Sequence, residues 1–262
     1  MKFSIFTKPW KTTPIDNLCE KISNWGFDGI ELPIRPGFQV EPKNAEKELP
    51  ALAKKASQYG LSIMSVASPP EENIFAACQA VGIPLIRIMA DFYPPKSYQD
   101  CENDFRASLS RLQPLCDKYN IKIGVQNHFG PMMINSVALK RLIKGFTPHI
   151  GAVWDAAHSG LAGEHAAQGL EVIWDDLLLV NLKNAYWKQT NGPEAKSAAW
   201  YPYFTAGQYG MASYPHIIDY LNTHNYKGDI CLPAEYTDES FIDELVPEEL
   251  KYVKHLISRR IA

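Results

Sequence analysis

The chain of 262 residues has no long apolar run, few cysteines and no cluster of basic residues. No stretch approaches the roughly 20 consecutive apolar residues that a membrane helix needs, and residues 1–11 lack the apolar run of a secretory signal. The five cysteines are scattered without a C-x-x-C pair, which excludes a disulfide framework and a zinc ribbon. We therefore expect a cytoplasmic protein with reduced thiols and no membrane partner.

The chain also has fewer basic than acidic residues. Lys and Arg number 26 against 29 Asp and Glu, a formal net charge of −3, and no basic run interleaved with aromatic residues could follow a phosphate backbone. Nucleic acid is therefore not an expected partner. The 46% hydrophobic and 21% charged content is that of an ordinary globular chain, and the charge balance favours a small polar substrate.

Short β-type runs alternate with amphipathic helical stretches along the whole chain. The clearest helix is expected over residues 44–59, where Leu49, Leu52 and Ala56 share one face and Gly60 follows the end. The same criteria predict strands near residues 3–7, 29–34, 61–68, 85–90, 121–128, 150–155, 178–185 and 228–236. Helices are expected over residues 15–25, 44–59, 71–81, 98–119, 136–145, 164–176, 214–225 and 244–260.

Eight strand–helix units in 262 residues average about 33 residues each, close to the norm for a closed barrel of eight parallel strands. A doubly wound open sheet would need a glycine-rich phosphate turn after its first strand, and residues 7–10 (TKPW) do not provide one. We therefore predict a single domain over residues 1–262, an α/β fold of the (β/α)8 TIM-barrel type.

The connection after the seventh strand is the longest. Residues 186–212 are too many for a turn, and they include Trp187, Trp200, Tyr201, Tyr203, Phe204 and Tyr209. We expect a long aromatic loop at the carboxyl end of the strand. Two interpretations stay open: a lid over the site, or a rigid excursion that covers the barrel or contacts a second copy in a homo-oligomer.

Polar residues lie near the carboxyl ends of strands five to eight, where inward-facing side chains of a barrel converge. They are Gln126 and His128 on strand five, Asp155 and the nearby His158 on strand six, Asn181 and Lys183 on strand seven, and Glu235 on strand eight. Glu31 and Arg87 have the same inward character on strands two and four. An internal ion pair is the simpler interpretation of these two, and contact with a substrate is the other.

With these residues the chain resembles the xylose-isomerase-like barrel family of sugar isomerases and epimerases, from residues 26–31 (GFDGIE) to Glu235. The resemblance implies a divalent metal held on strands five to eight, and the matching positions are Gln126, Asp155, Asn181 and Glu235. Gln126 stands where the family has Glu, and Asn181 where it has His. A set of oxygen donors favours Mg²⁺ or Mn²⁺ over Zn²⁺.

The resemblance also implies metal-assisted enolisation of a small carbohydrate or keto-acid. Gln126 cannot take up a proton, so Glu235 is the expected base, and Lys183 is a second candidate because burial would lower its pKa. His158 and His128 are placed to hydrogen-bond a substrate, and Trp10 and Trp187 to contact a sugar ring.

A different function stays open. The two amides at ligand positions also suit a non-catalytic or auxiliary barrel that binds a sugar after losing its metal. A metal-independent hydrolase is a weaker third possibility, because only Asp155 and Glu235 would supply its two carboxylates.

Overall fold

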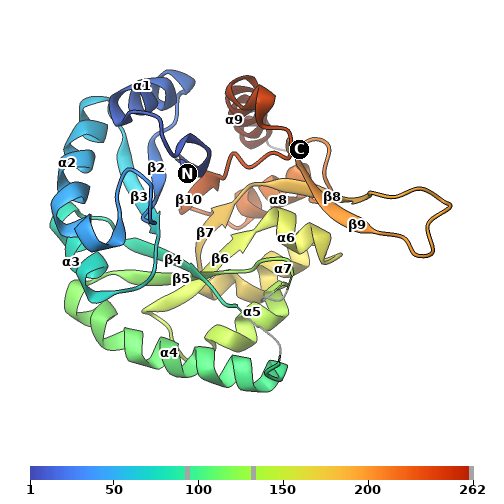
Figure 1. The fold of residues 1–262 in the computed structure, drawn as a ribbon, viewed down its shortest axis with the longest axis horizontal. Coiled ribbons are helices and arrows are strands. Elements are labelled where there is room, and N and C mark those ends of the chain that lie inside the picture. The colour runs from blue at the N-terminus through green and yellow to red at the C-terminus, as the bar shows by residue number, and fades with distance from the viewer. Residues whose placement is uncertain (92–94, 131–133, 260–262) are drawn as a thin grey trace.

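The computed structural model describes residues 1–91, 95–130 and 134–259. Eight parallel strands close into a barrel in the order β1-β10-β7-β6-β5-β4-β3-β2, which confirms the predicted fold class (Figure 1). They are β1 (Lys2–Phe6), β2 (Gly29–Pro33), β3 (Ser62–Ala67), β4 (Leu85–Met89), β5 (Lys122–Gln126), β6 (Ile150–Asp155), β7 (Leu177–Asn181) and β10 (Asp229–Leu232).

Helices surround the barrel, and most of them bury one apolar face against it (Figure 1). In α1, for example, Leu18, Cys19 and Ile22 are buried, and the helix ends at Gly26, whose left-handed backbone (φ 86°) lets its N–H donate to two helix carbonyls. The α-helices are α1 (Ile15–Trp25), α2 (Ala45–Gln58), α3 (Glu72–Val81), α4 (Tyr98–Tyr119), α5 (Ser136–Ile143), α6 (Ala156–Leu161), α7 (Ala166–Ile173), α8 (Tyr214–Thr223) and α9 (Ile242–Ser258).

Short 3-10 helices lie in the connecting segments: η1 (Lys8–Trp10), η2 (Pro42–Asn44), η3 (Trp174–Asp176) and η4 (Glu239–Phe241). The sequence did not predict α6, which follows β6 without a break. Asp155 begins it by accepting a hydrogen bond from the His158 N–H. None of the helices in the described part of the chain is long and apolar enough to cross a membrane.

The barrel interior contains a packed apolar layer. It consists of Phe6, Ala67, Leu85, Val153, Leu179 and Cys231. Gly124 faces this layer, and a Cβ at its position would lie 2.5 Å from Val153 Cγ2, so the position requires glycine. Polar residues share the interior, because Glu31, Ser65 and Arg87 lie in the middle of β2, β3 and β4 and bond to one another there.

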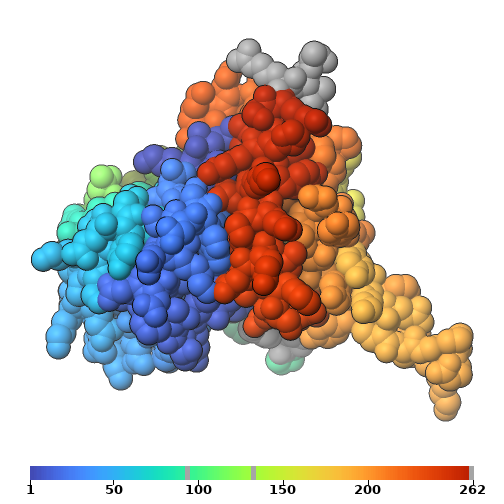
Figure 2. Space-filling model, turned by 90° about the horizontal axis from the view of Figure 1, so that it is seen from above, coloured from blue at the N-terminus to red at the C-terminus, as the bar shows by residue number. Residues whose placement is uncertain are grey.

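The segment after β7 is a β-hairpin, which corrects the expected loop. Strands β8 (Asn184–Gln189) and β9 (Trp200–Thr205) pair antiparallel, and the hairpin projects from the barrel as an arm (Figures 1 and 2). Aromatic residues favour this structure: the rings of Tyr186 and Tyr203 pair across the strands, 5.2 Å apart. Asn184 closes the base of the arm, because its side chain bonds the carbonyls of Gly207 and Ala212.

Candidate functional site

The four positions expected to hold a metal do gather at the carboxyl end of the barrel. The Gln126 amide donates to Asp155 Oδ2 over 2.7 Å, and Asp155 and Asn181 are neighbours in the β6–β7 register. Gln126, Asn181 and Glu235 line one cavity of about 50 Å³. The convergence that the strand pattern predicted is therefore present in the fold.

Lys183 occupies the centre of this group. Its Nζ lies 2.8 Å from Glu235 Oε2, 3.0 Å from His158 Nε2 and 3.5 Å from Asp155 Oδ2, and the side chain is buried. Burial alone would lower the pKa of Lys183, but Asp155 and Glu235 outweigh it and raise that pKa above its ordinary value. Lys183 is thus an internal ammonium ion, whereas the sequence suggested a lysine with a lowered pKa.

The ion pair expected between Glu31 and Arg87 is present. Arg87 Nε and Nη2 donate to the two carboxylate oxygens of Glu31 over 2.8 and 2.9 Å, and Ser65 donates to the same carboxylate. The remaining Nη1 donates to Gln126 Oε1. This contact fixes the amide: the oxygen of Gln126 faces Arg87, and its NH₂ faces Asp155.

Asp155 is fully buried, and both of its oxygens have partners. Oδ2 accepts from Gln126, and Oδ1 accepts from the backbone N–H of His158 over 3.2 Å. Asn127, which the sequence did not single out, bonds the backbone N–H of Asp155 through its side-chain oxygen over 2.7 Å. Burial raises the pKa of Asp155 above its ordinary value, and Lys183 counteracts the rise in part.

Glu235 lies three residues beyond β10 and binds two lysines. Lys183 donates to Oε2, and Lys8 of η1 donates to Oε1. Burial raises the pKa of Glu235, but the two ammonium groups outweigh it and hold the pKa far below its ordinary range. The carboxylate is therefore ionised at neutral pH. Lys8 itself is about half exposed, so it covers Glu235 from the solvent side.

Another buried carboxylate is bonded to the residue that follows Glu235. Glu249 of α9 accepts hydrogen bonds from the hydroxyls of Tyr214 and Tyr236, the latter adjacent to Glu235 in sequence. Burial raises the pKa of Glu249 to about 7, although both hydroxyls act to lower it. This cluster links α8 and α9 to the segment that carries Glu235.

The two histidines lie in contact. The ring centroids of His128 and His158 are 4.0 Å apart, and His128 lines the cavity. Burial, and then Lys183, lowers the pKa of His158 well below its ordinary value, and burial lowers that of His128. Both are neutral at pH 7. His158 Nδ1 has no hydrogen-bond partner among the described residues.

The two expected sugar-contacting tryptophans lie elsewhere. Trp10 is buried against Trp25, with ring centroids 5.7 Å apart, because η1 turns it toward α1. Trp187 belongs to β8, and its indole donates to the Leu161 carbonyl over 2.9 Å, which anchors the arm to α6. Neither is among the described residues that line the cavity, whereas Lys8 and Arg35, which the sequence did not single out, do line it.

The donor set does not fit the divalent metal that the resemblance implies. The NH₂ of Gln126 points at Asp155, its oxygen faces Arg87, and both oxygens of Glu235 bind lysines. Only Asn181 Oδ1 is buried without a partner among these four positions. Within the described residues no group of three or more His, Cys, Asp or Glu is arranged to hold a metal.

Charge leads to the same conclusion. Three carboxylates, those of Glu31, Asp155 and Glu235, already bind three cations, those of Arg87, Lys183 and Lys8. A divalent ion added to a balanced cluster would meet no uncompensated negative charge. The ammonium of Lys183 therefore stands between the two carboxylates in the role of a built-in cation.

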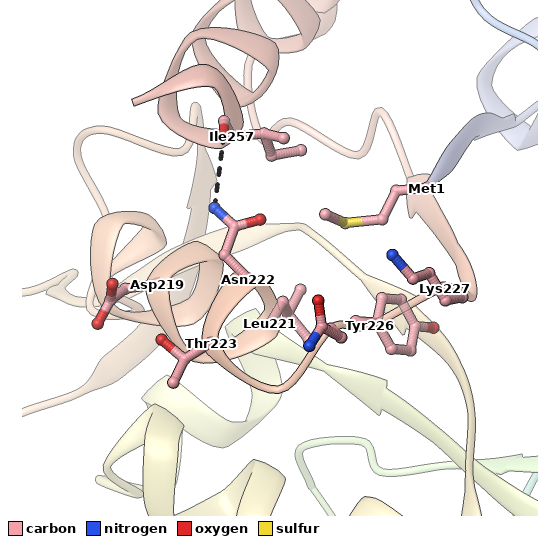
Figure 3. Close-up of a pocket in the computed structure, with 9 residues that line it drawn as sticks. Met1, Asp219, Leu221, Asn222, Thr223, Tyr226, Lys227 and Ile257 are labelled. Atoms are coloured by element: carbon pink, nitrogen blue, oxygen red, sulfur yellow. Dashed lines mark hydrogen bonds between the residues drawn. The ribbon is translucent and has the colours of Figure 1, made fainter. Parts of the chain in front are cut away.

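A larger cavity, of about 410 Å³, opens at the opposite end of the barrel (Figure 3). It lies between Met1, the end of α8 and the residues that precede β10, and Asn222 there bonds the Ile257 carbonyl. This is the amino end of the strands, where barrel enzymes carry packing and not chemistry. The cavity around Lys183 is thus the better candidate despite its size.

Comparison with solved structures shows the same fold in sugar epimerases. The 3-keto-D-glucoside 4-epimerase YcjR of E. coli is 15% identical, with a TM-score of 0.74 over 97% of this chain and 99% of that one. A D-tagatose 3-epimerase-like protein is 16% identical, with a TM-score of 0.75 over all of both chains. D-psicose 3-epimerase of Clostridium cellulolyticum H10 is 12% identical, with a TM-score of 0.73 over 98% and 99%.

Sequence comparison assigns the family. None of the curated protein sequences matches this chain. The model of the xylose isomerase-like TIM barrel matches residues 19–256, which include every barrel strand after β1 and all four positions at the carboxyl end. The chain therefore belongs to the xylose isomerase-like TIM-barrel family.

Proposed function

We propose that this protein is an isomerase or epimerase that moves a proton at the carbon beside the carbonyl of a small sugar or keto-acid. The observation that carries the proposal is the contact of Lys183 Nζ with the carboxylate of Glu235, 2.8 Å apart, at the cavity. A base and a positive charge side by side are what enolisation requires. The family and its epimerase neighbours support the same reaction class.

In this proposal Glu235 is the base. Its carboxylate takes the proton from the carbon, the C–H electron pair forms the enolate, and the ammonium of Lys183 stabilises the negative oxygen by a hydrogen bond. Return of the proton by Glu235 to the neighbouring carbon gives an isomer. Delivery of a proton from solvent to the opposite face, with Glu235 releasing its own proton to solvent, gives an epimer. The low pKa of Glu235 keeps the base ionised at neutral pH. Lys8, which is half exposed, swings into solvent when the substrate enters and frees Oε1.

No metal takes part in this proposal, because the donor atoms of Gln126, Asp155 and Glu235, three of the four expected positions, already have partners. Lys183 supplies the positive charge instead. An oriented donor to a developing oxyanion contributes about 100- to 1000-fold in rate in other enzymes. His158 holds the ammonium at 3.0 Å and, being neutral, adds no competing charge.

The test is exchange of carbon-bound hydrogen in D₂O, followed by NMR with D-fructose and D-tagatose as substrates. We expect deuterium at the carbon beside the carbonyl with the unsubstituted protein, and a loss of at least about 100-fold in E235Q. E20Q on the exposed side of α1 is the matched control and should exchange normally. Equal exchange in E235Q would overturn the assignment of the base. Binding of sugars without any exchange would favour an auxiliary sugar-binding barrel.

A further inference from the structure

One arginine at the cavity has no anionic partner. Arg35 follows β2, lines the cavity and is half-buried, yet no carboxylate of the described residues lies within ion-pair distance of it. Its guanidinium lies 5.9 Å from the centroid of the Phe6 ring, and Arg87 lies 4.7 Å from the same ring. A partly buried arginine without a counter-ion is uncommon, because burying an unpaired charge costs free energy.

A count of the charges around the cavity also identifies Arg35 as unpaired. Lys8, Arg87 and Lys183 are each bound to a carboxylate, and both histidines are neutral. Among the described residues around the cavity, Arg35 is therefore the cation in excess, and their formal charges sum to +1. Burial and the neighbouring Arg87 lower the pKa of Arg35, and the more distant carboxylates of Glu235 and Glu31 offset this only in part.

We infer that Arg35 binds the carboxylate of an acidic sugar substrate, so that this protein acts on a sugar acid and not on a neutral sugar. The inference rests on the proposed function and deepens it. A carboxylate matches the planar fork of a guanidinium with two parallel hydrogen bonds. Its single charge also neutralises the excess of +1, whereas a phosphate dianion would leave a negative site.

The placement of Arg35 suits this role. The cavity, of about 50 Å³, is lined by Arg35 as well as by Lys183 and Glu235. The reacting carbonyl would occupy it beside Lys183. The acidic end of the substrate then reaches the side of the cavity formed by the segment after β2, where Arg35 lies.

The test uses three ligands that differ only at one end: D-fructose, D-fructuronate and D-fructose 6-phosphate. Binding is measured by titration calorimetry. We expect D-fructuronate to bind about 10- to 100-fold more tightly than D-fructose, the range of a charge-assisted hydrogen-bonded pair. In R35Q this preference should disappear while the affinity for D-fructose stays. R35K should retain part of it, and R111Q on the exposed face of α4 should retain all of it.

The outcomes separate this inference from the proposed function. Equal affinity for D-fructose and D-fructuronate, or an unchanged preference in R35Q, overturns the role of Arg35 alone. Tighter binding of D-fructose 6-phosphate than of D-fructuronate overturns the assignment of a carboxylate. If none of the three ligands binds, the proposed sugar chemistry fails, and the inference fails with it. Melting temperatures of R35Q and R35K confirm that both variants are folded.

Discussion

Replacement of Lys183 by methionine tests the internal ammonium directly. Methionine keeps the length of the side chain but removes the charge that lies within 3.5 Å of Asp155 Oδ2, Glu235 Oε2 and His158 Nε2. Two carboxylates then face each other across the space that Nζ occupies. We expect a folded protein of lower stability that has gained affinity for a divalent cation.

The magnitude follows from the partners that remain. Removal of one member of a buried ion pair costs about 3–5 kcal/mol. Glu235 keeps Lys8, and Asp155 keeps the Gln126 amide, so the lower end of the range, about 3 kcal/mol, applies. For a chain of this size the melting temperature then falls by about 6–12 °C.

Thermal unfolding with and without MnCl₂ is the assay. The three freed donors, two carboxylate oxygens and one imidazole nitrogen, suit Mn²⁺, so K183M should regain about 2–3 kcal/mol at a Mn²⁺ concentration 100 times the dissociation constant. The unsubstituted protein and K47M, whose substitution lies on the exposed face of α2, should not respond. Stabilisation of the unsubstituted protein by Mn²⁺, or a K183M variant as stable as the parent, would refute the assignment of Lys183 as the built-in cation.

Three further predictions concern stability, and urea unfolding measures each of them. The fold raises the pKa of Glu249 from 4.5 to about 7, so the free energy of unfolding should fall by about 3 kcal/mol as the pH rises from 4.5 to 7 and then level off. E249Q should flatten this fall, and an equally steep profile in E249Q would contradict the prediction. Asn184→Ala should cost about 3 kcal/mol because two buried carbonyls lose their donor, whereas Asn191→Ala at the exposed tip should cost less; equal losses would exclude the closure of the arm by Asn184. Arg87→Met should lower the free energy of unfolding by about 4 kcal/mol, because it leaves the buried Glu31 carboxylate unpaired. Adding Glu31→Gln should recover part of that loss, and a double variant no more stable than Arg87→Met would contradict this reasoning.

The sequence predicted the barrel and the meeting of its polar strand ends for a clear physical reason. Alternation along a strand and the closure of eight strands fix which side chains face inward, so Gln126, Asp155 and Asn181 had to converge once their strands were recognised. Glu235 lies three residues beyond β10, where alternation no longer fixes the direction of a side chain. Alternation does not predict in which direction a side-chain amide forms its hydrogen bonds. The amide of Gln126 turns its NH₂ toward Asp155 only because Arg87 binds its oxygen, and that contact joins residues 39 positions apart.

Residues outside the strands were harder to predict. Lys8 and Arg35 belong to the segments after β1 and β2, whose paths are set by local turns and not by a repeating pattern. The pKa of Lys183 depends on two carboxylates 28 and 52 residues away, so burial alone suggested the wrong direction of shift. The hairpin arm is not predicted by barrel alternation, because β8 and β9 pair only with each other and not with the barrel strands.

A positive charge on a side chain differs from the charge of a metal ion that is bound from solution. Lys183 is synthesised with the chain, so the occupancy of the position between its two carboxylates does not depend on trace-element supply, on chelators, or on competition between ions of similar size. The arrangement also limits the ligands that can bind, because Nζ already donates to Glu235 and His158 and has one N–H left for a ligand oxygen. The position of Lys183 therefore favours ligands whose oxygen approaches Nζ along one direction.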